Sequence, residues 1–290
     1  MTNILVTGAN GQLGSELRKI SQNLKYYFYF TDIDELDLTD ISAIQEFFKG
    51  KEIYACINCA AYTAVDQAEN DIKNAIAINV TAVKNLAEVC AAYDALLFHI
   101  STDYVFDGNK CRPYIESDKE KPINVYGQTK YEGEIQALNK NNSTIIIRTS
   151  WLYSSFGANF VKTILRVGKE KDSLNVIFDQ IGTPTYGADL ADAILKIVDM
   201  TTSGSNISKY LGLYHYSNEG IASWYDFAIE IFKLAGIKCE VKPILTQEYP
   251  TVTQRPHFSV LDKSKIKSTF GLTIPHWKDS LAVCINQLGF

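Results

Sequence analysis

The sequence of 290 residues has no uninterrupted apolar run close to the roughly 18 residues that a membrane-spanning helix needs. It also has no internal repeat, no low-complexity tract and no block of like charge. A net charge of −5 and a pI of about 5.5 argue against a nucleic-acid-binding protein, which usually carries a basic patch. The chain starts directly on the strand-like Ile4-Leu5-Val6, so we expect no targeting peptide. These features predict a cytoplasmic protein that binds neither membranes nor nucleic acid.

Cysteine is sparse, and the six cysteines lie mostly in separate apolar segments, as expected of a reduced protein. Cys56 and Cys59 have C-x-x-C spacing, but they fall in residues 53–60, a segment that resembles a buried strand. Residues three apart on a strand point to opposite faces. We therefore expect this pair neither to bind a metal nor to form a disulfide.

What the first half does contain is a regular alternation of apolar strands and amphipathic helices. Strands are expected at 4–6, 26–30, 53–58, 96–101 and 144–148, and helices at 12–22, 43–48, 71–93 and 125–138. The pattern predicts an α/β fold with a Rossmann-type doubly wound parallel sheet. The aromatic segment 26–30 (YYFYF) is expected to be buried on both faces.

The second half is less regular and richer in loops. Helices are expected at 160–167, 188–198 and 224–235, and strands at 174–178 and 213–216. We expect residues 1–150 to form a dinucleotide-binding domain and residues 151–290 a smaller C-terminal α/β substrate-binding region. The two are expected to be partly interleaved, with residues 186–217 returning to the sheet.

Residues 6–14 (VTGANGQLG) place three glycines between the first strand and the first helix. Glycines allow a tight turn and a close approach to a pyrophosphate, and the helix N-terminus offers free N–H groups. The G-x-x-G-x-x-G spacing differs by one residue from the common dinucleotide fingerprint. The loop residues expected at the cofactor are Gly8, Asn10, Gly11, Gln12, Leu13 and Gly14.

Asp32 follows the second strand, where an acid commonly binds the adenosine ribose hydroxyls. Its charge disfavours a 2′-phosphate, and no Arg or Lys lies in the glycine loop or just after Asp32 to offset that charge. Charge alone therefore favours NADH, with NADPH tolerated. Asp37 and Leu38 are expected in the adenine pocket, although helix capping is an alternative role for Asp37 and for Asp40.

Tyr126 and Lys130 are four residues apart, hence on one face of the predicted helix 125–138. Lowering the tyrosine pKa from about 10 by three units takes about 4 kcal/mol. An ammonium at ~4 Å supplies about that much at an effective dielectric near 20. The pair is thus a candidate proton donor for carbonyl reduction. Thr102, with Ser101 as second choice, ends the fourth strand where its hydroxyl could polarise the carbonyl.

Several longer motifs accompany these residues. They are 101–108 (STDYVFDG), 58–66 (NCAAYTAVD), 148–153 (RTSWLY), 179–185 (DQIGTPT), Arg255-Pro256 and 259–262 (SVLD). Together with the glycine loop and Tyr-x-x-x-Lys, they resemble the extended short-chain dehydrogenase/reductase superfamily. Within it, the resemblance is to the dTDP-4-dehydrorhamnose reductases and runs nearly end to end.

The resemblance implies reduction of the C4 ketone of dTDP-4-dehydro-L-rhamnose to dTDP-L-rhamnose by NADPH or NADH. It implies that Thr102, Tyr126 and Lys130 form the catalytic triad, with Tyr126 as proton donor. It also implies that Tyr104 and Trp151 contact the sugar. The further cofactor residues that it implies are Ala60, Ala61, Tyr62 and Asn79.

Other assignments rest on less. Arg148 and Arg255 are candidates for the substrate diphosphate, because Arg binds phosphate oxygens with two N–H groups. A structural ion pair is the alternative role for either residue. Some of the proteins that the sequence resembles are dimers bridged by a metal ion that acidic residues bind. Glu16 matches one of these acids. The acids that bind the metal next to it have no clear counterpart around Asp189 and Asp192. We therefore expect no metal, with Mg²⁺ as the alternative, and a monomer or homodimer. The alternative functions are a sugar-nucleotide epimerase or dehydratase and a non-catalytic regulatory subunit.

Overall fold

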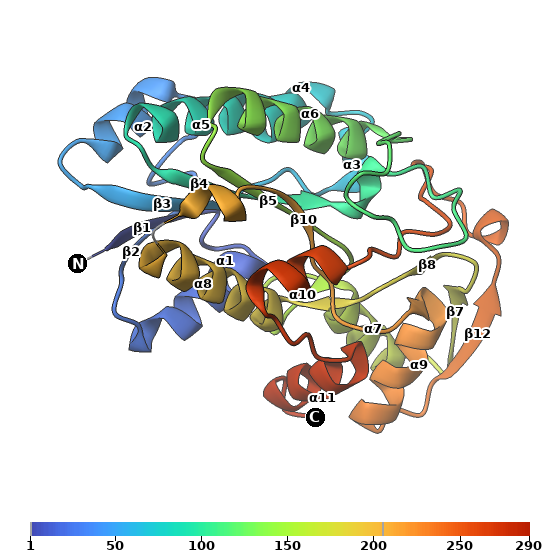
Figure 1. Ribbon diagram of the computed structural model, residues 1–290. Coiled ribbons are helices and arrows are strands. Elements are labelled where there is room, and N and C mark those ends of the chain that lie inside the picture. The colour runs from blue at the N-terminus through green and yellow to red at the C-terminus, as the bar shows by residue number, and fades with distance from the viewer. Residues whose placement is uncertain (1, 205) are drawn as a thin grey trace.

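The computed structural model describes residues 2–204 and 206–290. Its centre is a six-stranded parallel sheet with strand order β10-β5-β4-β3-β1-β2 (Figure 1). The strands are β1 (Asn3–Thr7), β2 (Tyr27–Thr31), β3 (Ile53–Asn58), β4 (Leu96–Thr102), β5 (Thr144–Thr149) and β10 (Gly212–His215). The predicted doubly wound parallel sheet is confirmed.

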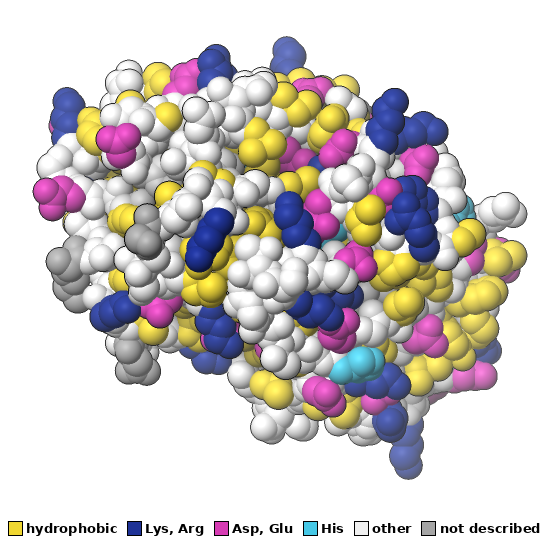
Figure 2. Space-filling view, viewed as in Figure 1, with side chains coloured by type: hydrophobic (Ala, Val, Ile, Leu, Met, Phe, Trp, Pro, Cys, Tyr) yellow, Lys and Arg dark blue, Asp and Glu magenta, His cyan; other side chains and the backbone are white. Residues whose placement is uncertain are grey.

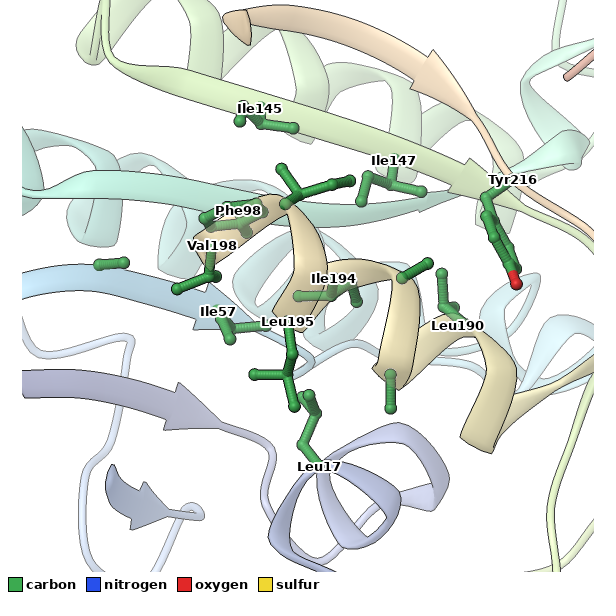
Figure 3. Close-up of a cluster of buried hydrophobic side chains, with 14 of the residues drawn as sticks. Leu17, Ile57, Phe98, Ile145, Ile147, Leu190, Ile194, Leu195, Val198 and Tyr216 are labelled. Atoms are coloured by element: carbon green, nitrogen blue, oxygen red, sulfur yellow. The ribbon is translucent and has the colours of Figure 1, made fainter. Parts of the chain in front are cut away.

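Helices cover both faces of this sheet (Figure 1). On one face lie α2 (Ile41–Phe48), α4 (Ile72–Ile76), α5 (Ala82–Ala92) and α6 (Val125–Lys140). On the other face lie α1 (Gln12–Ile20) and α8 (Gly187–Ser203). Figure 3 shows Leu190, Ile194 and Val198 of α8 packed over the strands. Each side of the sheet thus has its own apolar core.

The long helical segment of the first half contains a wider turn. Residues 72–92 are continuous, but Ala77–Thr81 forms a π-helical turn between α4 and α5. This segment is the one helix of the described residues that is long and apolar enough to cross a membrane, and half of its apolar window is buried in the fold. π turns of this kind occur frequently at functional sites.

The rest of the second half packs beside the carboxyl ends of the strands. Helices α7 (Phe160–Glu170), α9 (Trp224–Ala235) and α11 (Trp277–Gln287) share one apolar core with the parallel pair β7 (Ser173–Ile177) and β12 (Glu240–Ile244). Helix α10 (Ser264–Phe270) instead adds Ile266 and Phe270 to the core under α8. The sequence predicts no individual element after residue 235, and the structure places β12, α10 and α11 there.

Short elements complete the chain. They are α3 (Val65–Ala68), β6 (Leu152–Tyr153), β8 (Ile181–Gly182), β9 (Thr185–Tyr186), β11 (Ala222–Ser223) and 3₁₀ turns at Ser21–Asn23, Asp103–Val105, Ile207–Tyr210 and Thr246–Glu248.

The second strand also differs from expectation. β2 is an edge strand, and Tyr27 is 49% exposed, so the prediction of burial on both faces is wrong. The aromatic run instead covers an edge with rings that stack along the strand, such as Phe28 on Phe30. Elsewhere on the surface, the face in Figure 2 carries Lys and Arg side chains interspersed with Asp and Glu.

Candidate active site

The carboxyl ends of β1, β3 and β4 border two adjoining cavities. The chain leaves β1 and β3 in opposite directions across the sheet, and the space between such strands is where doubly wound proteins bind ligands. One cavity, of about 330 Å³, reaches Asp32. The other, of about 580 Å³, reaches Tyr126 and Lys130. The lining residues common to both are Gly8, Gly11, Cys59 and Ala61.

The glycine loop forms a cradle that side chains would block. Gly8 has φ +62°, and a Cβ there would lie 2.6 Å from the amide nitrogen of Ala60. A Cβ on Gly14 would lie 2.5 Å from the carbonyl oxygen of Gly8. Gly11, the N-cap of α1, has no side chain to cap the first turn. The first N–H groups of α1, beginning at Gln12 and Leu13, therefore face an anion-binding position.

Asp32 ends β2 beside this loop. Its carboxylate accepts hydrogen bonds from the backbone N–H groups of Asn10 (2.9 Å) and Ile33 (2.9 Å). Asp32 lines the smaller cavity together with Asp37 and Leu38, so the three residues predicted around the adenosine lie together.

Asp37 is held by its neighbour Thr39. It accepts hydrogen bonds from the hydroxyl (2.7 Å) and backbone N–H (2.8 Å) of Thr39, which lower the pKa of its carboxyl group. The N-cap of α2 is Asp40, which accepts from the N–H of Ser42 (2.9 Å). The capping alternative is therefore confirmed for Asp40 and wrong for Asp37.

The π turn supports the loop after β3. Asn79, fully buried, accepts a hydrogen bond from the N–H of Tyr62 (2.9 Å) and donates to its carbonyl oxygen (3.2 Å). Its amide also lies 3.1 Å from the hydroxyl of Thr129 on α6. A Cβ on Gly133 would lie 2.2 Å from the carbonyl oxygen of Asn79, so the π turn and α6 are in close contact. Asn79 thus connects the loop 60–62 to the helix that bears Tyr126.

Helix α6 begins at the site. The side chain of Asn124 caps it by accepting a hydrogen bond from the N–H of Gly127 (2.7 Å). A Cβ on Gly127 would lie 2.2 Å from the carbonyl oxygen of Tyr104, so the first turn of α6 lies against the end of β4. The rings of Tyr104 and Tyr126 meet edge to face with centroids 5.5 Å apart. The structure therefore brings Thr102, Tyr126 and Lys130 to one cavity.

The structure does not show the predicted effect of Lys130 on the pKa of Tyr126. Burial raises the pKa of Tyr126 to about 12, although the Thr102 hydroxyl beside it acts in the opposite direction. Burial also lowers the pKa of Lys130 to about 8, and its ammonium donates a hydrogen bond to the carbonyl oxygen of Ile100 (2.6 Å). Lys130 does not offset the effect of burial on Tyr126, so the predicted lowering of the Tyr126 pKa by Lys130 is wrong.

The hydroxyl of Thr102 is held by its neighbours. It lies 3.1 Å from a carboxyl oxygen of Asp103 and accepts a hydrogen bond from the N–H of Tyr104 (3.2 Å). When Asp103 is ionised it can only accept, so Thr102 must donate to it and presents a lone pair to the cavity. Burial raises the pKa of Asp103 to about 6. Sequence reasoning missed Asp103; its place between Thr102 and Tyr104 was the available signal. Ser101 lines the same cavity and is buried like Thr102, but its hydroxyl has no hydrogen-bond partner among the described residues.

Two tryptophans form the opposite wall. Trp151, at φ +46°, lies flat against Gly182, where a Cβ would come 2.6 Å from the indole. Its ring stacks on Trp224 with centroids 3.5 Å apart and planes 7° apart. Trp224 is the first residue of α9, whose N-cap Ser223 forms a capping box with Asp226. Sequence reasoning missed Trp224, which reads as an ordinary core position of an amphipathic helix.

The two arginines predicted to bind the diphosphate have different surroundings. Arg148 is fully buried and makes ion pairs with Glu134 (2.6 Å) and Glu120 (2.6 Å), so its assignment to the diphosphate is wrong. Arg255 makes an ion pair with Asp66 (2.8 Å). Burial and Asp103 raise the pKa of Tyr104, and the Arg255 guanidinium lowers it, which places Arg255 beside that tyrosine.

Glu16 does not face solvent. It is fully buried, accepts a hydrogen bond from the Ser154 hydroxyl (2.6 Å), and burial raises the pKa of its carboxyl group. Asp189 accepts from the side-chain amide of Asn218 (2.6 Å), and Asp192 pairs with Lys196 (2.7 Å). Within residues 2–204 and 206–290, no group of three or more His, Cys, Asp or Glu side chains is arranged to hold a metal ion.

A doubly wound sheet, a glycine cradle between β1 and β3, and a Tyr–Lys pair on α6 define a dinucleotide-binding protein of the short-chain dehydrogenase/reductase type. The chain belongs to the family described as the RmlD substrate binding domain, whose model matches residues 1–290. The family resemblance noted in the sequence is confirmed.

Relatives in this family resemble the chain over its whole length. A dTDP-4-dehydrorhamnose reductase of Aggregatibacter actinomycetemcomitans is 42% identical over 288 residues, covering 97% of each chain. A solved dTDP-4-dehydrorhamnose reductase of Clostridium acetobutylicum superposes with a TM-score of 0.94 at 42% identity and 100% coverage of both chains. The reductase of Bacillus anthracis, solved in complex with NADP, has a TM-score of 0.94 at 39% identity, covering 99% of this chain and 100% of that one.

Proposed function

We propose that this protein reduces the C4 ketone of dTDP-4-dehydro-L-rhamnose to dTDP-L-rhamnose with NAD(P)H. The observation that carries the proposal is the convergence of Thr102, Tyr126 and Lys130 on one cavity that opens onto the glycine cradle. The named reductases that match end to end support the choice of substrate.

The residues around the cradle fit a nicotinamide dinucleotide. The positions where a Cβ would clash, Gly8 and Gly14, allow the backbone to approach a pyrophosphate at the start of α1. Asp32 provides a carboxylate for ribose hydroxyls. When bound, the reduced nicotinamide supplies the hydride. The residues proposed to hold the cofactor are Gly8, Asn10, Gly11, Gln12, Leu13, Gly14, Asp32, Asp37, Leu38, Ala60, Ala61, Tyr62, Asn79, Tyr126 and Lys130.

Tyr126 is the proposed proton donor. As hydride adds to C4, the carbonyl oxygen gains charge and takes the phenolic proton, so the ketone becomes an alcohol. Thr102 orients the phenol through the lone pair that its hydrogen bond to Asp103 leaves free. Lys130, held on the carbonyl oxygen of Ile100, adds positive charge next to the phenol and the cofactor site.

The sugar nucleotide is proposed to enter between Tyr104 and the stacked tryptophans. Trp151 and Trp224 offer apolar faces to a sugar ring or base, and Arg255, which lies beside Tyr104, offers a cation to the diphosphate. The proposal divides the chain into a dinucleotide-binding domain (1–150) and a substrate-binding region (151–290). It also retains a cytoplasmic location and a monomer or homodimer.

The test is the oxidation of reduced cofactor in the presence of substrate. dTDP-4-dehydrorhamnose is generated in situ, and the absorbance of NADPH and of NADH is followed in parallel. Substrate-dependent loss of absorbance is expected, and the two rates rank the cofactors. No loss with either cofactor, from protein shown to be folded, contradicts the reductase proposal and favours an epimerase, a dehydratase or a regulatory subunit.

A further inference from the structure

The adenosine end of the site has a charge problem. Residues 32–37 (DIDELD) carry four acids, and Asp32 and Asp37 line the smaller cavity. Among the described residues that line this cavity, none carries a positive charge. A cofactor with a 2′-phosphate would therefore bring a dianion next to Asp32. Yet a relative 39% identical was solved in complex with NADP.

The fold brings one cation to this end from a distance in the sequence. Arg18 lies two turns into α1, and its guanidinium sits over the ring of Phe30 with 5.0 Å from Cζ to the ring centroid. Phe30 stacks on Phe28, so the edge strand forms an apolar base for the guanidinium. Such stacking holds the guanidinium by its face and leaves its N–H edges open.

The same guanidinium reaches the loop that binds the ribose acid. Its Nη1 lies 3.5 Å from the side-chain oxygen of Asn10, and the backbone N–H of Asn10 donates to Asp32 (2.9 Å). Asn10 therefore lies between the guanidinium and the carboxylate. Among the described residues, Arg18 makes no ion pair with a carboxylate, so most of its five N–H groups have no protein partner.

We infer that Arg18 binds the 2′-phosphate of NADPH and sets the preference between NADPH and NADH. The inference rests on the proposed use of NAD(P)H at this site. A nearby Arg is the residue that accommodates a 2′-phosphate in dinucleotide-binding folds. The planar guanidinium can give two N–H groups to phosphate oxygens while Asp32 binds the ribose. The expectation from charge alone considered the glycine loop and the residues just after Asp32, and Arg18 lies outside both segments.

The neighbouring Lys19 provides a matched control. It follows Arg18 on α1 and has the same charge, but its ammonium donates to the side chain of Gln287 (3.0 Å). It therefore points toward α11 and not toward Asn10. Both cations lie in the last turn of α1 and favour that helix end equally, so a general effect on the helix would appear in both variants.

The experiment measures binding of two ligands that differ only by the 2′-phosphate. Calorimetric titrations use adenosine 2′,5′-bisphosphate and adenosine 5′-monophosphate on wild type, R18Q, R18K and K19Q. In R18Q the affinity for the bisphosphate should fall by roughly tenfold, with the monophosphate unchanged. The affinity of R18K for the bisphosphate should lie between those of wild type and R18Q, because lysine keeps the positive charge but lacks the two parallel N–H groups of the guanidinium. K19Q should match wild type. NADPH and NADH form a second pair of ligands that differ by the 2′-phosphate. In R18Q the affinity for NADPH relative to NADH should fall by the same factor as the affinity for the bisphosphate relative to the monophosphate.

Equal loss of both ligands in R18Q, or no loss of either, would overturn the role of Arg18. These titrations need no sugar substrate, so they are independent of the proposed reaction. If no keto-sugar is reduced but the bisphosphate preference depends on Arg18, the function proposal fails and this inference stands. If turnover occurs, the ratio of kcat/KM for NADPH over NADH should fall in R18Q by the same factor.

Discussion

The phenol of Tyr126 is the group on which the proposed chemistry depends. Replacing it in Tyr126→Phe removes the proton donor and leaves the ring packed against Tyr104. We expect kcat to fall by roughly 10²–10⁴-fold. Binding of reduced cofactor, measured by fluorescence titration, should remain within a few-fold of wild type.

Tyr131 on the same helix provides the control for that variant. It packs against the buried cluster that contains Phe106 and Tyr114 and does not line the cavity of Tyr126 and Lys130, so Tyr131→Phe should keep its turnover. Near-normal turnover of Tyr126→Phe would remove Tyr126 as the donor, and loss of turnover in both variants would point to a disturbed helix.

Asp103 links the site to stability. Its pKa in the folded protein, about 6, lies above the ordinary value of 3.8 because the carboxyl group is buried. Ionisation of Asp103 therefore lowers the free energy of unfolding. This loss of stability is absent below about pH 4, grows as the pH rises, and is complete above about pH 6. The separation of the two values corresponds to about 3 kcal/mol.

Asp103→Asn does not ionise, so its free energy of unfolding relative to wild type should rise with pH. Urea unfolding at about pH 4 and about pH 7 should show the difference rising by up to about 3 kcal/mol. Asp107→Asn is the control. Burial acts to raise the pKa of Asp107, but hydrogen bonds from Asn109 and Tyr114 leave it below 3.8. The stability that this carboxylate contributes is therefore gained below about pH 4, so the difference for Asp107→Asn should stay nearly constant between about pH 4 and about pH 7. A difference for Asp103→Asn that does not change with pH would contradict the buried ionised carboxylate.

Single residues differ in how far the sequence reveals them. The spacing of Tyr126 and Lys130 is read directly, because a helix places positions four apart on one face. The contact of Arg18 with Asn10 depends on how α1 lies beside β2, and the bond of Thr102 to Asp103 depends on a rotamer. Neither contact can be inferred from the spacing of these residues in the sequence. Arg148 was misjudged for the same reason, since nothing local shows that it pairs with Glu134.

At the scale of elements, the close contact of α1 with β1 depends on Gly14. A Cβ there would meet only backbone, the carbonyl oxygen of Gly8 at 2.5 Å and Cα of Ala9 at 2.6 Å. Backbone cannot yield as a flexible side chain can, so Gly14→Ala should lower the free energy of unfolding by about 1–3 kcal/mol. Denaturant unfolding measures this. Gly11→Ala, whose Cβ would lie 3.2 Å from one oxygen, should lower it less. Equal effects would contradict the steric account.

The stack of Trp151 on Trp224 joins the end of β5 to the start of α9. At 3.5 Å between centroids no ring fits between the two indoles, so a ligand that inserts there must separate them. Separation loses about 0.5–1.5 kcal/mol of ring contact. We expect circular dichroism of the free protein to show an exciton couplet from this pair.

Trp224→Phe should abolish that couplet, and Trp277→Phe should keep it, since Trp277 is the third tryptophan and lies in the buried core. Titration with dTDP then shows whether nucleotide binding separates Trp151 from Trp224. A decrease of the couplet shows that the nucleotide parts the indoles. An unchanged couplet at saturating dTDP shows that the ligand rests outside a stack that stays closed.

Most elements around the sheet were predictable, because buried parallel strands read as apolar runs and their helices have one apolar stripe. The predictions failed where burial is partial. β12 contains Lys242 and Pro243 and is largely exposed, so it shows no apolar run. The exposure of β2 follows from its place at the sheet edge, which its aromatic sequence does not reveal.

At the scale of the molecule, the two halves of the chain share one framework. β10, from the second half, pairs with β5, and α8 covers the sheet face beside α1. The buried Asn218 accepts a hydrogen bond from the N–H of Tyr186 and donates to Asp189 of α8 and to Ser280 of α11. The substrate-binding region that we propose is thus attached to the sheet by pairing, packing and a buried polar network.

This sharing predicts a single cooperative unfolding transition. Loss of α8 or β10 would expose the sheet, and loss of the sheet would leave Asn218 and Asp189 unsatisfied, so neither half should persist alone. Scanning calorimetry should give one transition whose calorimetric and van't Hoff enthalpies agree. Saturating NADPH, which binds only the folded chain, should move the whole transition to higher temperature. Two transitions, with only the first or second shifted by NADPH, would show that residues 1–150 and 151–290 unfold independently despite the shared strand.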